Sequence, residues 1–112
     1  MLERFASHPV GDIGISVITL AELEYGVMKS SRPARNQEAL EQFVSPLEVA
    51  SFDRAATAAY GRLRTTLEKK GQPVGSMDLL IAAHAVSLDV RLITHNVKEF
   101  GRVPGLRIED WA

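Results

Sequence analysis

Four polar side chains at three places along the chain are of the types that bind metal ions. Glu22 lies about two turns into one predicted helix, and Asp78 lies in the first turn of another. Asn96 and Glu99 follow a short predicted strand. Clustered carboxylates repel one another and need a counter-charge, which Mg²⁺ or Mn²⁺ supplies through oxygen ligands. Such a metal lowers the pKa of a bound water and holds a phosphate for in-line attack, so these residue types suit phosphodiester hydrolysis.

Each of these residues also has a simpler structural explanation. Glu22 has no cation at its neighbouring helical positions and suits a solvated helix, because glutamate is a good helix former. Asp78 could complement its helix dipole by about 0.3–1 kcal/mol, although that helix is too apolar for a surface helix. Asn96 and Glu99 have the spacing of a capping box. The residue pattern alone leaves both interpretations open.

Other catalytic motifs are absent from the sequence. It contains no phosphate-binding Gly-Lys-Ser/Thr loop, no Gly-x-Gly-x-x-Gly, no His-Glu-x-x-His and no Gly-x-Ser-x-Gly. His84 shares a helix face with apolar residues, so we predict a core or interface histidine rather than a metal ligand. His8 is expected to be exposed. His95 lies beside the candidate site and could contact a substrate.

Length and composition indicate one globular domain. The chain has 112 residues, 46% of them hydrophobic, and no cysteine, which excludes disulfides and thiolate metal sites. A net charge of -1 excludes a general polycation, so any nucleic-acid contact must come from a local patch. Candidate cations are Arg62 and Lys69 on one helix, and Arg102 and Arg107 around the last strand, with a solvated charged face as the alternative. No apolar run approaches about 18 residues, so we expect a soluble cytoplasmic protein without a membrane segment.

The elements that must position these residues alternate along the chain. Residues 1–8 are predicted to be the end of a helix. Ser16, Asp53 and Ser76 are predicted N-caps. Strands are predicted over 13–15, 47–52, 91–94 and 106–108, and helices over 17–29, 34–44, 54–70 and 77–88. This order predicts an α/β fold with four strands in a mainly parallel sheet and helices on both faces, whose ligand site lies beyond the carboxyl ends of the strands.

Four segments resemble, in order, the motifs of VapC-type PIN-domain ribonucleases, the toxins of toxin–antitoxin pairs. They are Ile15 to Gly26, Gly71 to Ala85, Leu92 to Phe100 and Val103 to Trp111. The resemblance covers essentially the whole chain. Several motifs in the right order are far more specific than any one of them, so the resemblance implies a single PIN domain over residues 1–112.

The resemblance implies an α/β PIN-like domain and a Mg²⁺-dependent (or Mn²⁺-dependent) endoribonuclease. Glu22 and Asp78 match acids of the family, and both are implied metal ligands. Asn96 stands where many PIN domains have an aspartate, and Glu99 is a nearby acid that assists catalysis. The implied substrate is a structured RNA such as tRNA. The implied partners are a VapB-like antitoxin and a second copy of the chain in a homodimer.

One family feature is missing from this sequence. The family begins with an apolar strand that ends in an aspartate, whereas Asp12 here precedes its strand. We therefore expect an N-terminally incomplete domain whose first, central strand is missing. Two explanations compete, a start codon placed too far downstream and a true truncation. The rival function is a catalytically inactive domain that only binds antitoxin or dimerises.

Overall fold

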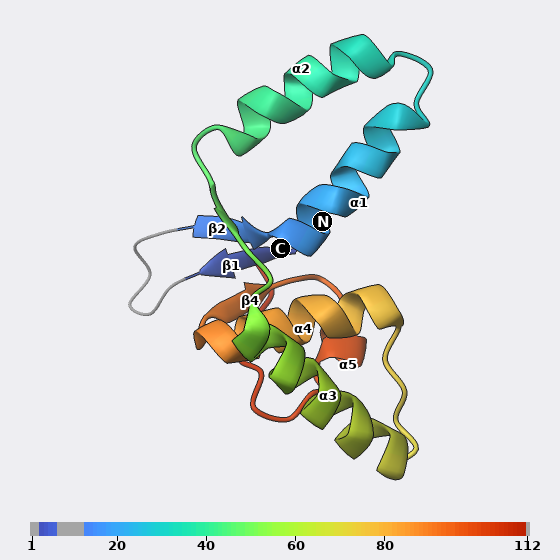
Figure 1. Ribbon diagram of the computed structural model, residues 1–112, viewed down its shortest axis with the longest axis vertical. Coiled ribbons are helices and arrows are strands. Elements are labelled where there is room, and N and C mark those ends of the chain that lie inside the picture. Colours follow the sequence, from blue (N-terminus) through green and yellow to red (C-terminus); the bar gives the residue numbers. More distant parts are fainter. Residues whose placement is uncertain (1–2, 7–12, 112) are drawn as a thin grey trace.

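The computed structural model describes residues 3–6 and 13–111, which form a mixed α/β structure (Figure 1). His8 and Asp12 lie outside the described residues. In chain order the elements are β1 (Arg4–Ala6), β2 (Ile13–Ser16), α1 (Val17–Met28), α2 (Pro33–Val44), β3 (Glu48–Ala50), α3 (Arg54–Lys69), α4 (Ser76–Leu88), β4 (Arg91–Ile93), α5 (Val97–Phe100) and β5 (Ile108–Glu109). The predicted α/β class is confirmed.

The strands form one five-stranded sheet in the order β3-β2-β1-β4-β5. β2 pairs with β3 in parallel, and β4 pairs with β5 in parallel. β1 lies between these two pairs and runs antiparallel to both neighbours. The prediction of a mainly parallel sheet of four strands therefore needs correction, because the sheet is mixed and has a fifth strand at its centre.

That fifth strand, β1, comes from a segment that was predicted to be helical. The helix prediction is wrong for residues 4–6, which pair with both β2 and β4. Phe5 and Ala6, adjacent residues whose side chains point to opposite faces of the sheet, are both buried. The pairing satisfies backbone groups of β2 and β4 that would otherwise be exposed edges. Among the described residues, β1 thus occupies the centre of the sheet.

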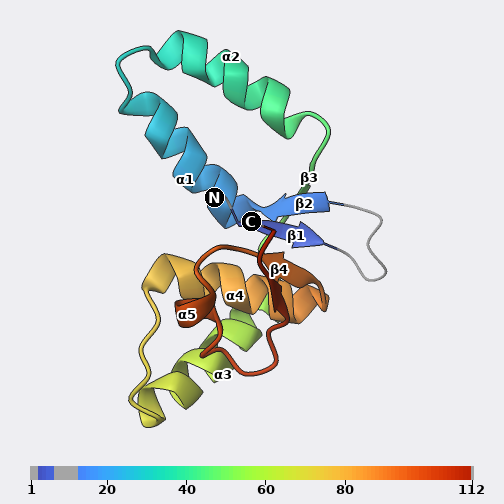
Figure 2. The same ribbon diagram turned by 180° about the vertical axis from the view of Figure 1, so that it is seen from behind.

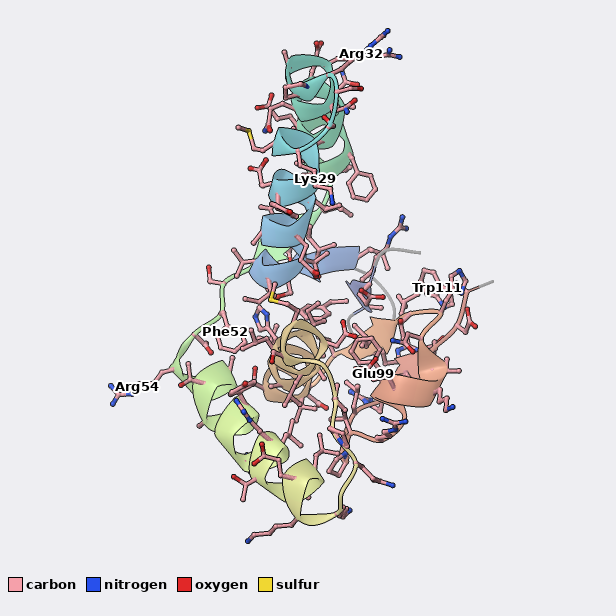
Figure 3. The ribbon with its side chains drawn as sticks, turned by 90° about the vertical axis from the view of Figure 1, so that its right-hand side faces the viewer. Lys29, Arg32, Phe52, Arg54, Glu99 and Trp111 are labelled. Atoms are coloured by element: carbon pink, nitrogen blue, oxygen red, sulfur yellow. The ribbon has the colours of Figure 1, made fainter. Side chains whose placement is uncertain are left out.

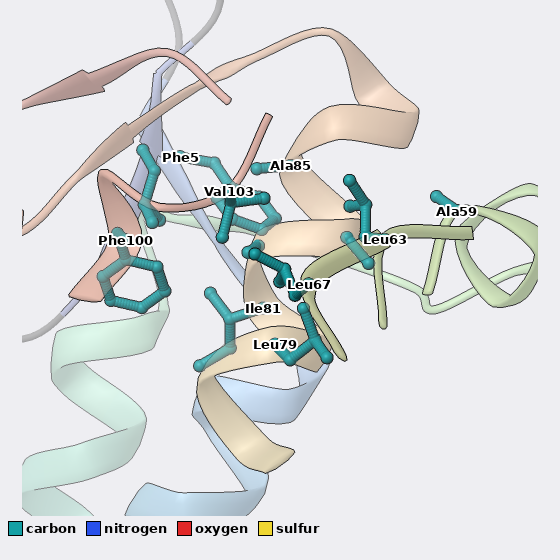
Figure 4. Close-up of a cluster of buried hydrophobic side chains, with 12 residues drawn as sticks. Phe5, Ala59, Leu63, Leu67, Leu79, Ile81, Ala85, Phe100 and Val103 are labelled. Atoms are coloured by element: carbon teal, nitrogen blue, oxygen red, sulfur yellow. The ribbon is translucent and has the colours of Figure 1, made fainter. Parts of the chain in front are cut away.

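The hydrophobic core lies between the sheet and the helices α3 and α4 (Figure 4). Phe5 of β1 and Leu92 of β4 are register partners and belong to this core. Leu63 and Leu67 of α3 pack into it from the opposite side. The apolar α4 is the middle layer, and its buried residues are Leu79, Ile81, Ala82, Ala83, His84 and Ala85.

Helices α1 and α2 form a hairpin that projects away from the core (Figure 2). The hairpin leaves large apolar side chains in solvent, including Tyr25 (67% exposed) and Met28 (72% exposed). Among the helices described, none has the length and apolar character needed to cross a membrane.

Two of the three predicted N-caps are confirmed. Ser16 Oγ accepts from the N–H of Ile18, and the Asp53 carboxylate accepts from the N–H of Ala56. The prediction for Ser76 is wrong, because Gly75 is the N-cap of α4 and no side chain caps this helix. A glycine at that position leaves the first turn of α4 open to other hydrogen-bond acceptors.

The predicted core histidine is confirmed, since His84 is fully buried. Its Nε2 donates to the carbonyl of Ser51 (2.9 Å), so the neutral ring accepts from the Ser16 hydroxyl at Nδ1 (2.8 Å). Burial lowers the pKa of His84, which favours this neutral form. The hydrogen bonds of His84 connect α4 to the ends of β2 and β3.

Candidate active site

The candidate site lies at the edge of the sheet where β2 and β4 end. Because β1 is antiparallel to both strands, its N-terminal end reaches the same edge. The first turn of α4 contributes Asp78, and α5 contributes Glu99. Figure 3 shows Glu99 near the middle of the molecule, well away from the hairpin tip at Arg32. This edge is where open α/β sheets bind ligands.

Glu99 is held by hydrogen bonds from two directions. Its Oε1 accepts from the N–H of Gly75 at 2.7 Å, and its Oε2 accepts from the Asn96 amide at 3.1 Å. The Gly75 bond is the main reason that the pKa of Glu99 is lowered, helped by hydrogen bonds from Asn96 and Asp78 and by the charge of Arg102. Glu99 is therefore an ionised carboxylate that binds the backbone of Gly75, the N-cap residue of α4.

Asp78 lies next to Glu99 and carries the opposite shift. The pKa of Asp78 is raised to about 6, mainly by burial and then by the negative charges of Glu99, Glu3 and Glu22. These are the effects expected of carboxylates that share a site without a counter-charge. The geometry therefore brings together Asp78 and Glu99, with Glu3 and Glu22 close enough to affect Asp78 electrostatically.

Asn96 belongs to the same cluster, but the predicted capping box is wrong. No side chain caps α5, although the Asn96 carbonyl accepts from the N–H of Phe100. The Asn96 amide donates to Glu99, and the backbone N–H of Asn96 donates to Thr94 Oγ1 (3.0 Å). Asn96 thus orients the carboxylate of Glu99 rather than the start of the helix.

Glu3 was missed by the sequence analysis. Its Oε2 accepts from the hydroxyl of Thr94 at 3.1 Å, and its charge acts on Asp78. Nothing in the sequence around Glu3 marks it, because its place depends on the pairing of Arg4 with Ile93. A three-residue strand gives too short a pattern to be recognised.

The other candidates divide between the site and the remaining surface. Glu22 is exposed on α1, and its charge reaches Asp78. His95 is exposed, and its Nδ1 is hydrogen-bonded to the carboxylate of Asp110. Arg102 lies near Glu99, whose pKa it helps to lower.

The remaining predicted cations lie away from the acidic cluster or on open surface. Arg107 bonds to Asp89, at the C-terminal end of α4 and far along the chain from Asp78. Arg62 and Lys69 are exposed on α3. Of the four predicted cations, Arg102 is the one that the structure brings to the acidic residues.

The donor chemistry of the site suits a hard divalent cation. Within residues 3–6 and 13–111, no three acidic or histidine side chains converge closely enough to hold one metal ion together. Mg²⁺, however, is usually bound by one or two carboxylates and keeps several waters, and Asp78 and Glu99 form such a pair. Burial is the main cause of the raised pKa of Asp78, and the charges of Glu99, Glu3 and Glu22 that add to it are ones that a cation would neutralise. The residues present fit such an ion.

Comparisons with known proteins agree with this arrangement. The family model for the PIN domain matches residues 2–106. The chain is 50% identical over 99 residues to Ribonuclease VapC2 of Rickettsia felis, covering 88% of this chain and 74% of the relative. It is also 50% identical over 98 residues to the tRNA(fMet)-specific endonuclease VapC of Salmonella typhimurium, with the same coverage of each chain.

Solved structures show the same fold. VapBC2 from Rickettsia felis, bound to a DNA fragment from its promoter, contains a chain that matches with a TM-score of 0.86 and 49% identity. DNA-bound VapBC from Salmonella typhimurium matches equally well. Each match covers 88% of this chain and 74% of the other. The chain therefore belongs to the PIN-domain family of nucleases, which generally depend on divalent metal ions, and within it to the VapC ribonucleases.

Proposed function

We propose that this chain is a Mg²⁺-dependent endoribonuclease toxin of a VapBC-like system that cuts structured RNA, with tRNA(fMet) as the favoured substrate. The observation that carries the proposal is the Asp78–Glu99 pair at the carboxyl-end edge of the sheet, with further negative charge around it. The tRNA assignment rests on relatives from Salmonella typhimurium and Shigella flexneri that are named tRNA(fMet)-specific endonucleases.

The proposed roles follow from how each side chain is held. Asp78 is the principal metal ligand, and Glu22 is the second family acid, facing the site from α1. Glu99 is fixed by Gly75 and Asn96, so it holds Asp78 in place and assists it. When bound, the metal supplies an activated water and neutralises charge that develops on the phosphate. Arg102, beside Glu99, is the cation best placed to contact the RNA backbone.

The proposed partners are a VapB-like antitoxin and a second copy of the chain. The α1–α2 hairpin supports this, because Tyr25 and Met28 present apolar surface that the chain itself does not cover. The solved relatives from Rickettsia felis and Salmonella typhimurium are VapBC complexes bound to DNA. A tRNA substrate would place the activity in the cytoplasm.

The decisive experiment is cleavage of labelled tRNA by matched variants. Asp78→Asn should reduce Mg²⁺-dependent cleavage by on the order of 100-fold, because it removes the principal metal ligand. Asp89→Asn is the control, since it makes the same chemical change at an exposed helix end. Chelation with EDTA should stop cleavage by the parent chain. Unchanged cleavage by Asp78→Asn would exclude the proposed role.

A second candidate function is an inactive domain that only binds antitoxin or dimerises. It is favoured by one observation, that no three ligating side chains converge among the described residues. This candidate predicts a stable complex with the antitoxin and no cleavage of tRNA at any Mg²⁺ concentration. Measurable Mg²⁺-dependent cleavage that Asp78→Asn removes would exclude it.

A further inference from the structure

Three cations gather at the end of the α1–α2 hairpin that points away from the sheet. Lys29, Arg32 and Arg35 are all exposed, and we refer to them as the basic tip. From Gly26 to Gln37 the chain carries these three cations and no acid, although its net charge is -1. Figure 3 shows Arg32 at the far end of the hairpin, with Lys29 also on it. The basic tip is therefore a local positive patch on a chain that is not cationic as a whole.

The cations of the basic tip differ from most arginines of the core region in having no acidic partner. Three other arginines form ion pairs, namely Arg64 with Glu68, Arg91 with Glu109 and Arg107 with Asp89. Within residues 3–6 and 13–111, no acid forms an ion pair with Lys29, Arg32 or Arg35. The Lys29 ammonium instead lies over the ring of Tyr25, 5.4 Å from its centroid. The charge of the basic tip is thus available to an anionic partner.

Charge is segregated along the hairpin. Its four acids lie nearer the sheet than the cations along each helix, and they are Glu22 and Glu24 of α1 and Glu38 and Glu41 of α2. A polyanion is repelled by the acidic part of the hairpin and attracted by its far end. This distribution favours contact through the basic tip alone, rather than along the whole hairpin.

Helix α1 sets the distance between the basic tip and the edge of the sheet that carries the candidate site. It begins at Val17, directly after β2, and its 12 residues span about 18 Å. That length corresponds to about five stacked nucleotides of one strand, at about 3.4 Å each. A single nucleotide cannot reach both places. A ligand that does so must be an extended polyanion, and a structured RNA has the required size and charge.

We propose that the basic tip is a docking surface for the phosphate backbone of the RNA substrate, about 18 Å from the bond that is cut. Phosphate contacts of this kind fix the position of an RNA without reading its sequence. The inference rests on the proposed function, since it takes the same RNA as its ligand. It adds the requirement that the substrate extend well beyond the cleavage site.

The test is binding of fluorescently labelled tRNA(fMet) to the 112-residue chain in EDTA, so that neither cleavage nor metal binding contributes. The double variant Lys29→Gln/Arg32→Gln should weaken binding by about 10-fold. It should also reduce the slope of log affinity against log salt concentration by about 2, one for each lost phosphate contact. Circular dichroism checks that the variant is folded.

Two further double variants serve as controls. Arg54→Gln/Lys70→Gln removes the same two charges from exposed positions at the ends of α3, and it should bind tRNA within about twofold of the parent chain. Lys29→Arg/Arg32→Lys exchanges the two side chains but keeps both charges, so it should also bind as the parent chain does. Together they separate a local contact from an effect of net charge or of altered packing.

Cleavage in the presence of Mg²⁺ separates docking from catalysis. The basic tip is remote from the candidate site, so its contacts are made equally by the bound substrate and by the transition state. Lys29→Gln/Arg32→Gln should therefore raise KM by about 10-fold and leave kcat within about twofold of the parent value. A fall in kcat with unchanged KM would contradict a docking role.

Other results would also overturn the inference, and they differ in what else they exclude. If Lys29→Gln/Arg32→Gln binds tRNA as tightly as a parent chain that cleaves it, the basic tip is solvated surface and the proposed nuclease function stands. Equal losses in the Arg54→Gln/Lys70→Gln control would reduce the effect to net charge. Weaker binding of the antitoxin alone would assign the basic tip to the protein interface. A parent chain that neither binds nor cleaves tRNA would exclude the docking surface and the proposed function together.

Discussion

The core around α4 and the α1–α2 hairpin are built in different ways. In α4 the central residues are buried almost without interruption. In the hairpin, α1 buries Thr19 and Val27, and α2 buries Leu40. Apolar side chains such as Tyr25 and Met28 remain exposed there. The core is stabilised by its own packing, whereas the hairpin has apolar surface left for a partner.

The candidate site joins these two regions. Asp78 and Glu99 come from the core, and Glu22 comes from the hairpin helix α1. Elements with few buried contacts open more readily than a packed core, so Glu22 should be held less firmly than Asp78.

The largest expected effect comes from the core. Leu67 of α3 packs into the core and is only 1% exposed. Leu67→Ala should therefore lower the free energy of unfolding by about 2–5 kcal/mol. That loss is a large part of the stability of a small domain. Urea unfolding measures it. Leu88→Ala, at 41% exposure, is the control and should cost clearly less. Equal losses would contradict the contrast between core and surface.

The next effect concerns the link between the two regions. Ser16→Ala removes the N-cap of α1 and leaves the buried Nδ1 of His84 without a donor. The expected loss of unfolding free energy is about 1–3 kcal/mol. Asp53→Ala removes a cap that makes no hydrogen bond to His84, so it should cost less. A cost for Ser16→Ala no greater than for Asp53→Ala would show that the His84 contact adds nothing.

A pH titration of stability sharpens the description of the site. The folded-state pKa of Asp78 is about 6, above its usual 3.8, so between these pH values the folded protein holds a proton that the unfolded chain has released. The stability of the parent chain should therefore be highest at low pH and fall as the pH rises from 3.8 to about 6. In EDTA, Asp78→Asn should therefore melt at a higher temperature than the parent chain above pH 6. The difference should shrink toward pH 4. A difference that does not change with pH would exclude the charge effect.

The smallest effect on stability is expected at the hairpin surface. Met28 is 72% exposed, so Met28→Ser should change the free energy of unfolding by no more than about 0.5 kcal/mol. If the hairpin binds the antitoxin, the same variant should weaken that complex by about 10-fold or more. Arg32→Ser, an exposed polar change at the hairpin tip, is the control. Calorimetric titration with the antitoxin measures the affinity of both variants. Unchanged affinity for Met28→Ser would show that Met28 is not part of the interface.

Much of the fold could be predicted because it depends on local chemistry. Ser16 and Asp53 cap helices through their own nearby backbone, so the sequence pattern is enough to identify them. The burial of His84 follows from its apolar neighbours along one helix. Asn96 and Glu99 were recognised as a pair, but their partners were not. Glu99 binds Gly75, which is 24 residues away in the sequence, instead of closing a local capping box.

The sequence by itself determined the α/β class, most helix boundaries and the acids Glu22, Asp78 and Glu99 as candidates. The tertiary structure alone decided the centre of the sheet and the place of Glu3. Residues 4–6 have no local pattern strong enough to define a strand, and they form one because β2 and β4 offer unpaired backbone groups on both sides. The direction of that pairing brings Glu3 to Thr94, a contact that spans 91 positions and that no local rule encodes.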